Sequence, residues 1–216
     1  MNHVHLEALA TSFSTLARLH LTAPTPEILE ELKTLYTQWP LQEEFTGKST
    51  LPETITGLSE WNKSFENSED AGDIADDLNL LYGRTATAKI APYESVHRGQ
   101  DGLVFDVQTL EVRDLYRELN LQAPNLNREP DDHIGLEFDF IAQVLTFWLT
   151  ALDNNAPSDA ERYRNAVVTF YKDHASLWIP TFLTEAHELA DSLFIRGLLS
   201  ISLGAVKELE SGLMES

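Results

Sequence analysis

Apolar residues recur every three or four positions along almost the whole chain, and this period limits the fold more than any other feature. Near the N-terminus, Leu6, Leu9 and Phe13 fall on one face of a helix, and Leu16 and Leu19 continue that face. No run of alternating apolar and polar residues is long enough to build a sheet. The pattern therefore predicts an all-α fold of about eight or nine helices.

Caps and prolines divide the helical pattern into elements. Thr25 is suited to cap a helix that has Pro26 at its first position. Farther along, Ser158-x-x-Glu161 is a capping-box pattern, and Pro180 predicts a break between two helices. The expected helices span residues 5–20, 25–39, 52–65, 69–82, 107–119, 133–152, 158–175, 181–194 and 198–211. The most apolar of these, 133–152, is expected at the centre of the fold.

Two segments interrupt the helical period. Residues 83–102 predict a loop, and loops of about 20 residues in compact domains are generally functional or disordered. Apolar side chains within this loop favour an ordered one. Residues 120–131 hold prolines and asparagines and predict a hinge. The expected organisation is an N-terminal helical half, 1–119, which includes the 83–102 loop, then the hinge, then a C-terminal helical half, 132–216.

The charge of the chain limits its partners. The sequence has 35 acidic and 15 basic residues, a formal net charge of -20. Such a surface repels phosphate backbones and anionic lipids, so we expect no nucleic acid and no stable membrane insertion. A basic peptide would be attracted. Solubility or adaptation to salt explains the same charge equally well, so charge alone names no partner.

Composition also bears on the compartment. The chain has no cysteine, which excludes disulfides, thiolate catalysis and cysteine metal sites. The N-terminus lacks the basic and apolar regions of a secretory signal. No stretch approaches the roughly 18 apolar residues that span a bilayer. These features predict a cytoplasmic protein.

Motifs for catalysis and cofactor binding are missing from the sequence. No pair of histidines has a metal-ligand spacing, and neither a phosphate-binding glycine loop nor a hydrolase nucleophile motif occurs. Paired carboxylates are expected by chance in so acidic a chain. We therefore predict no catalytic residue, no metal and no cofactor, and the protein is not expected to be an enzyme.

One segment of interest lies in the long loop, at Pro92-Tyr93-Glu94-Ser95-Val96. A proline followed by an aromatic residue can form one wall of an apolar pocket. The plainer interpretation is a loop held to the core by Tyr93, and the residues alone favour it.

The second segment runs from Glu129 to Glu137. Asp131 or Asp132 can accept from the free N–H groups at the start of the next helix, and His133 would lie in its first turn. Gly135 is a poor helix former, so it indicates close approach by another element. From spacing alone, a helix cap with an incidental histidine explains this segment better than a site does.

Taken together, the two segments resemble the TorD/DmsD-like family of redox-enzyme maturation chaperones. In that family a leucine-aromatic helix end precedes a proline-aromatic loop with Ser-Val, and a Pro-x-Asp-His-x-Gly motif follows about forty residues later. The matching pieces here are Leu81-Tyr82, Pro92–Val96, Pro130–Gly135 and the C-terminal His174-x-x-x-Trp178-x-Pro180-x-Phe182.

The resemblance implies a TorD-like helical bundle and a chaperone function. It implies binding of the twin-arginine leader and apo form of a molybdopterin-containing oxidoreductase, which assists cofactor insertion and prevents premature export. A chain with a hinge such as residues 120–131 can exchange halves, so we expect a monomer that can also form a domain-swapped dimer. The leader-binding residues carried over from the family motifs are Leu81, Tyr82, Pro92, Tyr93, Ser95, Asp132 and His133.

Two other classes of function stay open at this point. In a small hydrolytic or nucleotide-using enzyme, His133 would be the general base, Asp132 its orienting partner and Ser95 the nucleophile. In an acidic interaction scaffold, the surface would bind basic partners without recognising arginine. The sequence names neither the client enzyme nor a bound nucleotide.

Overall fold

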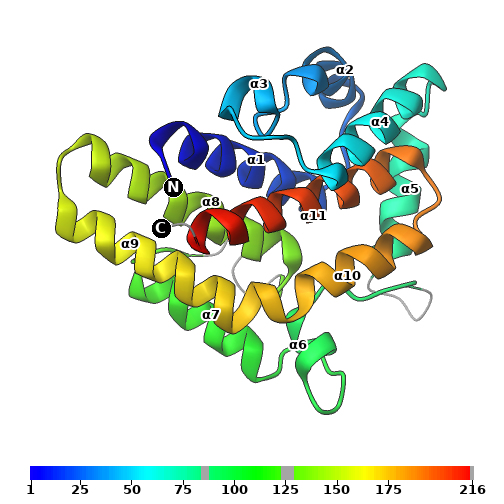
Figure 1. The fold of residues 1–216 in the computed structure, drawn as a ribbon. Coiled ribbons are helices and arrows are strands. Elements are labelled where there is room, and N and C mark those ends of the chain that lie inside the picture. The colour runs from blue at the N-terminus through cyan, green and yellow to red at the C-terminus, as the bar shows by residue number, and fades with distance from the viewer. Residues whose placement is uncertain (84–87, 123–128, 215–216) are drawn as a thin grey trace.

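The computed structural model describes residues 1–83, 88–122 and 129–214 of the chain. Within these ranges the regular structure is helical and contains no β-strand (Figure 1), which confirms the all-α prediction. The α-helices are α1 (His3–Leu21), α2 (Pro26–Leu35), α3 (Glu43–Thr46), α4 (Pro52–Glu66), α5 (Ala71–Tyr82), α6 (Glu94–Arg98), α7 (Val107–Glu118), α8 (Ile134–Asp153), α9 (Pro157–Phe170), α10 (Ser176–Leu189) and α11 (Leu193–Met214).

The helices outnumber the eight or nine expected because two short ones were not predicted. Helix α3 has 4 residues and helix α6 has 5. An apolar stripe becomes visible only over about 11 residues or more, so helices of one turn leave no periodic signal. Helix α6 lies within the predicted 83–102 loop and gives it a turn of regular structure.

Helix α8 lies at the centre of the fold, as its composition predicts. Helix α1 packs along it on one side and α9 on another (Figure 1). By length and composition alone α8 could cross a membrane, but 67% of its apolar window is buried inside the molecule. That burial is what a core helix requires.

Gly135 allows α1 and α8 to approach closely, which confirms the prediction made from this glycine. A Cβ atom at Gly135 would lie 2.6 Å from Cγ of Leu21 and 3.0 Å from the carbonyl oxygen of Ala17. Beyond this contact the Phe13 ring packs edge-on against Phe138, with centroids 5.1 Å apart. The glycine therefore fixes how the start of α8 seats on α1.

A second close helix pair, α4 with α11, also depends on glycine. A Cβ atom at Gly57 would lie 2.6 Å from the carbonyl oxygen of Gly197. The indole of Trp61 covers Gly197 and donates to the carbonyl oxygen of Phe194 at 2.9 Å. This pairing joins an early helix to the last one.

Pro180 does not separate two helices, contrary to the sequence prediction. It lies inside α10, which continues from α9 through a π-helical turn at Tyr171–Ala175. An interior proline costs about 3 kcal/mol because it removes a main-chain hydrogen bond. Trp178 and Phe182 flank it and are fully buried, and each large apolar side chain buried contributes about 1.5–3 kcal/mol. Tertiary packing therefore outweighs the local penalty.

Two predicted helix boundaries were also wrong. Helix α9 begins at Pro157 without a side-chain cap, so Ser158 lies inside the first turn and forms no capping box. The last two helices separate at residues 190–192 rather than 195–197. There, Asp77 and Glu69 accept from four successive main-chain N–H groups at 2.8–3.1 Å. These distant carboxylates set where α11 starts.

The two predicted halves pack against each other over long helices. Helix α1 lies along α8 and helix α4 along α11, so each pair joins one half to the other. Within the predicted 120–131 hinge, residues 123–128 lie outside the described part of the chain, as do residues 84–87 of the long loop. The division into halves stays a prediction.

The cap on α11 provides a test of this packing. Asp77 accepts from the N–H and hydroxyl of Ser192 as well as from Asp191. Asp77→Ala should lower the free energy of unfolding by roughly 2 kcal/mol, because charge-assisted bonds to a helix start are lost. Chemical denaturation measures this. Asp76→Ala, the exposed neighbour, should change it by less than about 0.5 kcal/mol; equal effects would contradict the assigned cap.

Candidate functional site

The two motif segments meet in space where α8 begins. The main-chain N–H of Ile134 donates to the carbonyl oxygen of Pro92 at 2.9 Å, and that of Glu94 donates to Asp132 at 3.0 Å. Together they form an isolated antiparallel bridge between Tyr93 and His133. The loop before α6 is therefore bonded to the start of α8, although about forty residues separate them in sequence.

Asp132 is the centre of this junction. Its side chain is fully buried, and its Oδ2 accepts from the main-chain N–H of Ser95 at 2.8 Å. Its Oδ1 accepts from the hydroxyl of Thr109 at 2.7 Å. The carboxylate thus bonds to the start of α6 and to α7, and Asp132 itself lies just before α8 in the chain. The sequence interpretation assigned Asp131 or Asp132 to the cap of α8, and this assignment was wrong.

His133 is itself the cap of α8. Its Nδ1 accepts from the main-chain N–H of Gly135 at 3.0 Å, so this nitrogen carries no proton. The ring packs edge-to-face against Tyr93 and Tyr82, at centroid distances of 5.4 Å and 6.3 Å. Asp131, beside Asp132, instead pairs with Arg113 of α7 at 2.5–2.8 Å.

A cleft of about 420 Å³ opens beside the junction. Tyr82, Tyr93 and His133 line it with aromatic rings, and Glu129 adds a carboxylate that accepts from the hydroxyl of Tyr93 at 2.8 Å. The other lining residues are His20, Leu21, Leu78, Asn79 and Gly83. The cleft therefore combines aromatic surface with one acidic group.

His20 forms the inner wall of the cleft. Its Nδ1 is 2.9 Å from the hydroxyl of Tyr82 and its Nε2 is 2.8 Å from the hydroxyl of Ser202. Full burial, and the nearby His133, lower the pKa of His20 to about 3. The imidazole is therefore neutral at physiological pH and holds Tyr82 to α11.

The seven predicted leader-binding residues divide into two groups. Tyr82, Tyr93 and His133 line the cleft. The other four, Leu81, Pro92, Ser95 and Asp132, are buried behind it. Sequence reasoning missed His20, which lies 62 positions before Tyr82 and shows no local signal. It also gave no binding role to Glu129, the first residue of the second segment. The structure thus brings all seven to one region, where all are buried and three of them line the cleft.

A group of buried acidic side chains lies behind the junction. Glu94, Asp132 and Glu137 are all fully buried. Glu94 pairs with Arg98 and with Nδ1 of His174, which is 2.9 Å away. Both oxygens of Glu137 lie 3.2 Å from the indole nitrogen of Trp178.

Burial favours the protonated form of Glu137. Burial raises the pKa of Glu137 well above its usual range, and the negative charges of Glu94 and Asp132 raise it further. A protonated Glu137 can donate a hydrogen bond to Glu94, which removes one charge from a cluster that burial penalises. The cluster links α6, α8 and α10.

The catalytic alternative does not fit this geometry. The two oxygens of Asp132 accept hydrogen bonds from Ser95 N–H and from the Thr109 hydroxyl. Nδ1 of His133 accepts from Gly135 N–H. Asp132 therefore does not orient His133 as a base. The Ser95 hydroxyl is fully buried, away from any incoming substrate. In the part of the chain that the structure covers, no three His, Cys, Asp or Glu side chains are grouped to hold a metal ion.

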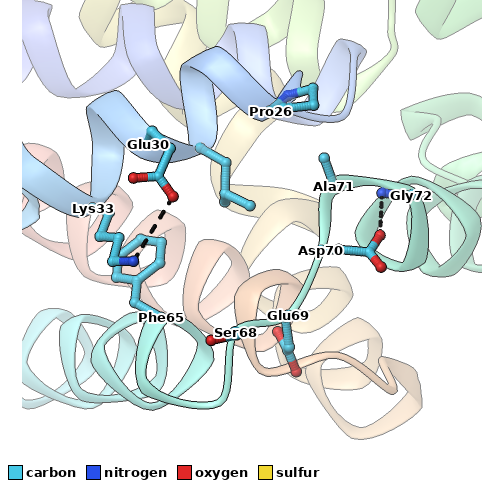
Figure 2. A pocket seen from close by; sticks show the side chains of 10 residues that line it. Pro26, Glu30, Lys33, Phe65, Ser68, Glu69, Asp70, Ala71 and Gly72 are labelled. Carbon is cyan, nitrogen blue, oxygen red and sulfur yellow. Dashed lines mark hydrogen bonds and ion pairs between the residues drawn. The ribbon is translucent and has the colours of Figure 1, made fainter.

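A second hollow, of about 370 Å³, lies between α2 and the turn from α4 to α5 (Figure 2). Its polar groups already have structural partners. Asp70 caps α5 by accepting from Gly72 N–H at 2.7 Å, and Lys33 pairs with Glu30 (Figure 2). Glu69 caps α11. This hollow therefore has fewer groups directed toward a ligand than the aromatic cleft.

These features define a helical protein with an aromatic, acidic cleft beside the junction of its two motif segments. A family model described as nitrate reductase delta subunit matches residues 48–184. Chaperone protein TorD of Vibrio atlanticus is 24% identical over 159 residues, which cover 73% of each chain. Chaperone protein TorD of Photobacterium profundum is 29% identical over 133 residues, which cover 61% of this chain and 60% of that protein.

The family match covers more than half of the chain, so this chain belongs to the nitrate reductase delta subunit family, among the TorD/DmsD-like chaperones and not among enzymes. The family predicted from the motif segments is therefore confirmed. The matched region contains both of those segments.

Asp132 provides a test of how the junction between α6, α7 and α8 is held together. Asp132→Ala should lower the free energy of unfolding by about 3 kcal/mol, because Ser95 N–H loses its buried acceptor. Asp132→Asn keeps an oxygen for Ser95 and an amide for Thr109, so it should retain most of the stability. Denaturation of both variants measures this. Equal losses would show that the negative charge, not the cap, is what matters.

Glu137 gives a pH-dependent prediction. Its folded-state pKa is raised, so its stabilising contribution is complete below the ordinary pKa of about 4.5 and is lost as pH rises through the folded-state value. Glu137→Gln keeps the donor and cannot lose a proton. The stability of this variant relative to the unmodified chain should therefore rise between pH 5 and pH 8, as denaturation at several pH values measures. A constant difference would contradict the raised pKa.

Proposed function

We propose that this chain is a cytoplasmic chaperone that binds the twin-arginine leader and the apo form of a molybdopterin-containing oxidoreductase. Binding of this kind assists cofactor insertion and prevents export before the enzyme is complete. The observation that carries the proposal is the cleft, which is lined by Tyr82, Tyr93, His133 and Glu129. The chain around it has a formal net charge of -20.

The chemistry of the cleft suits an arginine-containing apolar peptide. A guanidinium group can stack on the rings of Tyr82 or Tyr93 and pair with the carboxylate of Glu129. The apolar part of a leader can cover the ring edges and Leu78. Apolar burial should supply most of the affinity, at about 25 cal/mol per Å² before ordering costs, since an exposed ion pair adds only about 0–1 kcal/mol.

His133 offers the sharpest test of the site. Asparagine is a good helix cap, so His133→Asn preserves the bond to Gly135 N–H while it removes the ring from the cleft. Calorimetry with synthetic twin-arginine leaders should show an affinity loss of about 1–2 kcal/mol, the usual value of an aromatic or cation–π contact. His3→Asn, on the exposed start of α1, is the matched control and should bind like the unmodified chain.

The outcomes of this experiment separate the site from the function. If no leader binds the unmodified chain, the proposed function is wrong. If a leader binds and His133→Asn binds it equally well, the leader occupies another surface.

A leader in which Lys-Lys replaces Arg-Arg separates recognition from attraction by charge. A scaffold that uses only its acidic surface would bind both peptides equally. Planar guanidinium groups stack and pair bidentately whereas ammonium groups do not, so we expect weaker binding of the Lys-Lys peptide.

A further inference from the structure

An exposed apolar surface follows α6, on the side of that helix away from Tyr93. It consists of five side chains that are each 41–60% exposed: Leu103, Val104, Phe105, Val107 and Leu110. We call these five residues the apolar knob. Isolated exposed apolar residues are common, but several that follow one another closely in the chain point to an interaction site.

Close contacts and the backbone conformation fix the position of the loop that carries the knob. Gly99 and Asp106 meet at the base of the loop, where a Cβ on Gly99 would lie 2.9 Å from Oδ2 of Asp106. Asp106 also caps α7 by accepting from Val107 N–H at 2.8 Å. Phe105 has a φ of 68°, a left-handed conformation that a bulky side chain rarely adopts. The loop therefore projects from the body below α6 (Figure 1), and its shape fits a concave partner.

The rim of the knob is negatively charged. Asp101, Asp106 and Glu111 lie between Gly99 and Val112, and this stretch contains no lysine or arginine. The nearest basic residues on either side already have partners. Arg98 pairs with Glu94 and donates to the carbonyl oxygen of Asp173, and Arg113 pairs with buried Asp131.

These charges select the kind of partner. A second copy of this chain, at net charge -20, would bring like charges together around the knob, and an anionic membrane would repel it. An apolar groove edged by lysine or arginine would complement both the shape and the charge.

We propose that the apolar knob docks into a basic-edged apolar groove on the apo catalytic subunit, outside its leader. The inference rests on the proposed function, and the position of the knob supports this occupant. Helix α6 has only 5 residues, about 7.5 Å of helix, so the cleft at Tyr93 and the loop that starts at Gly99 lie at its two ends. A client with its leader in the cleft would have its body near the knob.

The test uses a double variant, Leu103→Ser with Phe105→Gly. Glycine accepts the left-handed backbone at residue 105, so the variant should fold and melt no lower than the unmodified chain. The control is Ile55→Ser with Leu152→Ser, which removes two similarly exposed apolar side chains from α4 and α8.

Two ligands are measured against each chain by calorimetry. One is the leader peptide that the unmodified chain binds. The other is the catalytic subunit that carries this leader in nature, produced without the leader and without its cofactor. In the knob variant, affinity for the leaderless subunit should fall at least about tenfold, as expected for loss of a central apolar contact. Affinity for the leader should change by less than about twofold, because the sites are separate.

Several results would overturn the inference while leaving leader binding intact. One is a knob variant that binds the leaderless subunit as well as the control does. Another is an unmodified chain that binds the leader but not the leaderless subunit. A third is sedimentation showing a dimer of this chain that only the knob variant loses, which would make a second copy the occupant.

Discussion

The carboxylate of Asp132 is the interaction on which the site depends. It is buried, and it bonds to the start of α6 through Ser95 and to α7 through Thr109 while its own chain enters α8. A buried carboxylate is stable only when its oxygens are fully bonded, so these three elements must keep their relative positions. Asp132 therefore positions the walls of the cleft from behind, without reaching the cleft itself.

The surrounding side chains support this arrangement through shape and charge. Gly135 lets α8 seat closely on α1, which brings His20 to the inner wall of the cleft. In the buried acidic cluster, Glu94 of α6 contacts His174 of the π-helical turn and Glu137 of α8 contacts Trp178 of α10. Burial lowers the pKa of His20 to about 3 and raises the pKa of Glu137, so it favours the neutral form of both side chains.

Helix α6 connects the two surfaces that we assign to the client. The cleft has concave aromatic walls suited to an arginine-containing leader, whereas the apolar knob is convex and suited to a groove on a folded subunit. Asp132 accepts from Ser95 N–H beside Tyr93 at the start of α6, and Asp106 caps α7 at the base of the knob.

The sequence by itself determined the helical class, most helix positions, the close approach at Gly135 and, through its motif segments, the family. These features depend on periodicity and on short local patterns, which a sequence displays directly. Only the tertiary structure decided that Pro180 lies within a helix, because burial of Trp178 and Phe182 outweighs the local penalty. It also decided that His133, not Asp132, caps α8, and that Tyr82, Tyr93 and His133 face the cleft while Ser95 does not. Bonds between residues far apart in the chain control those outcomes, and no local pattern encodes them.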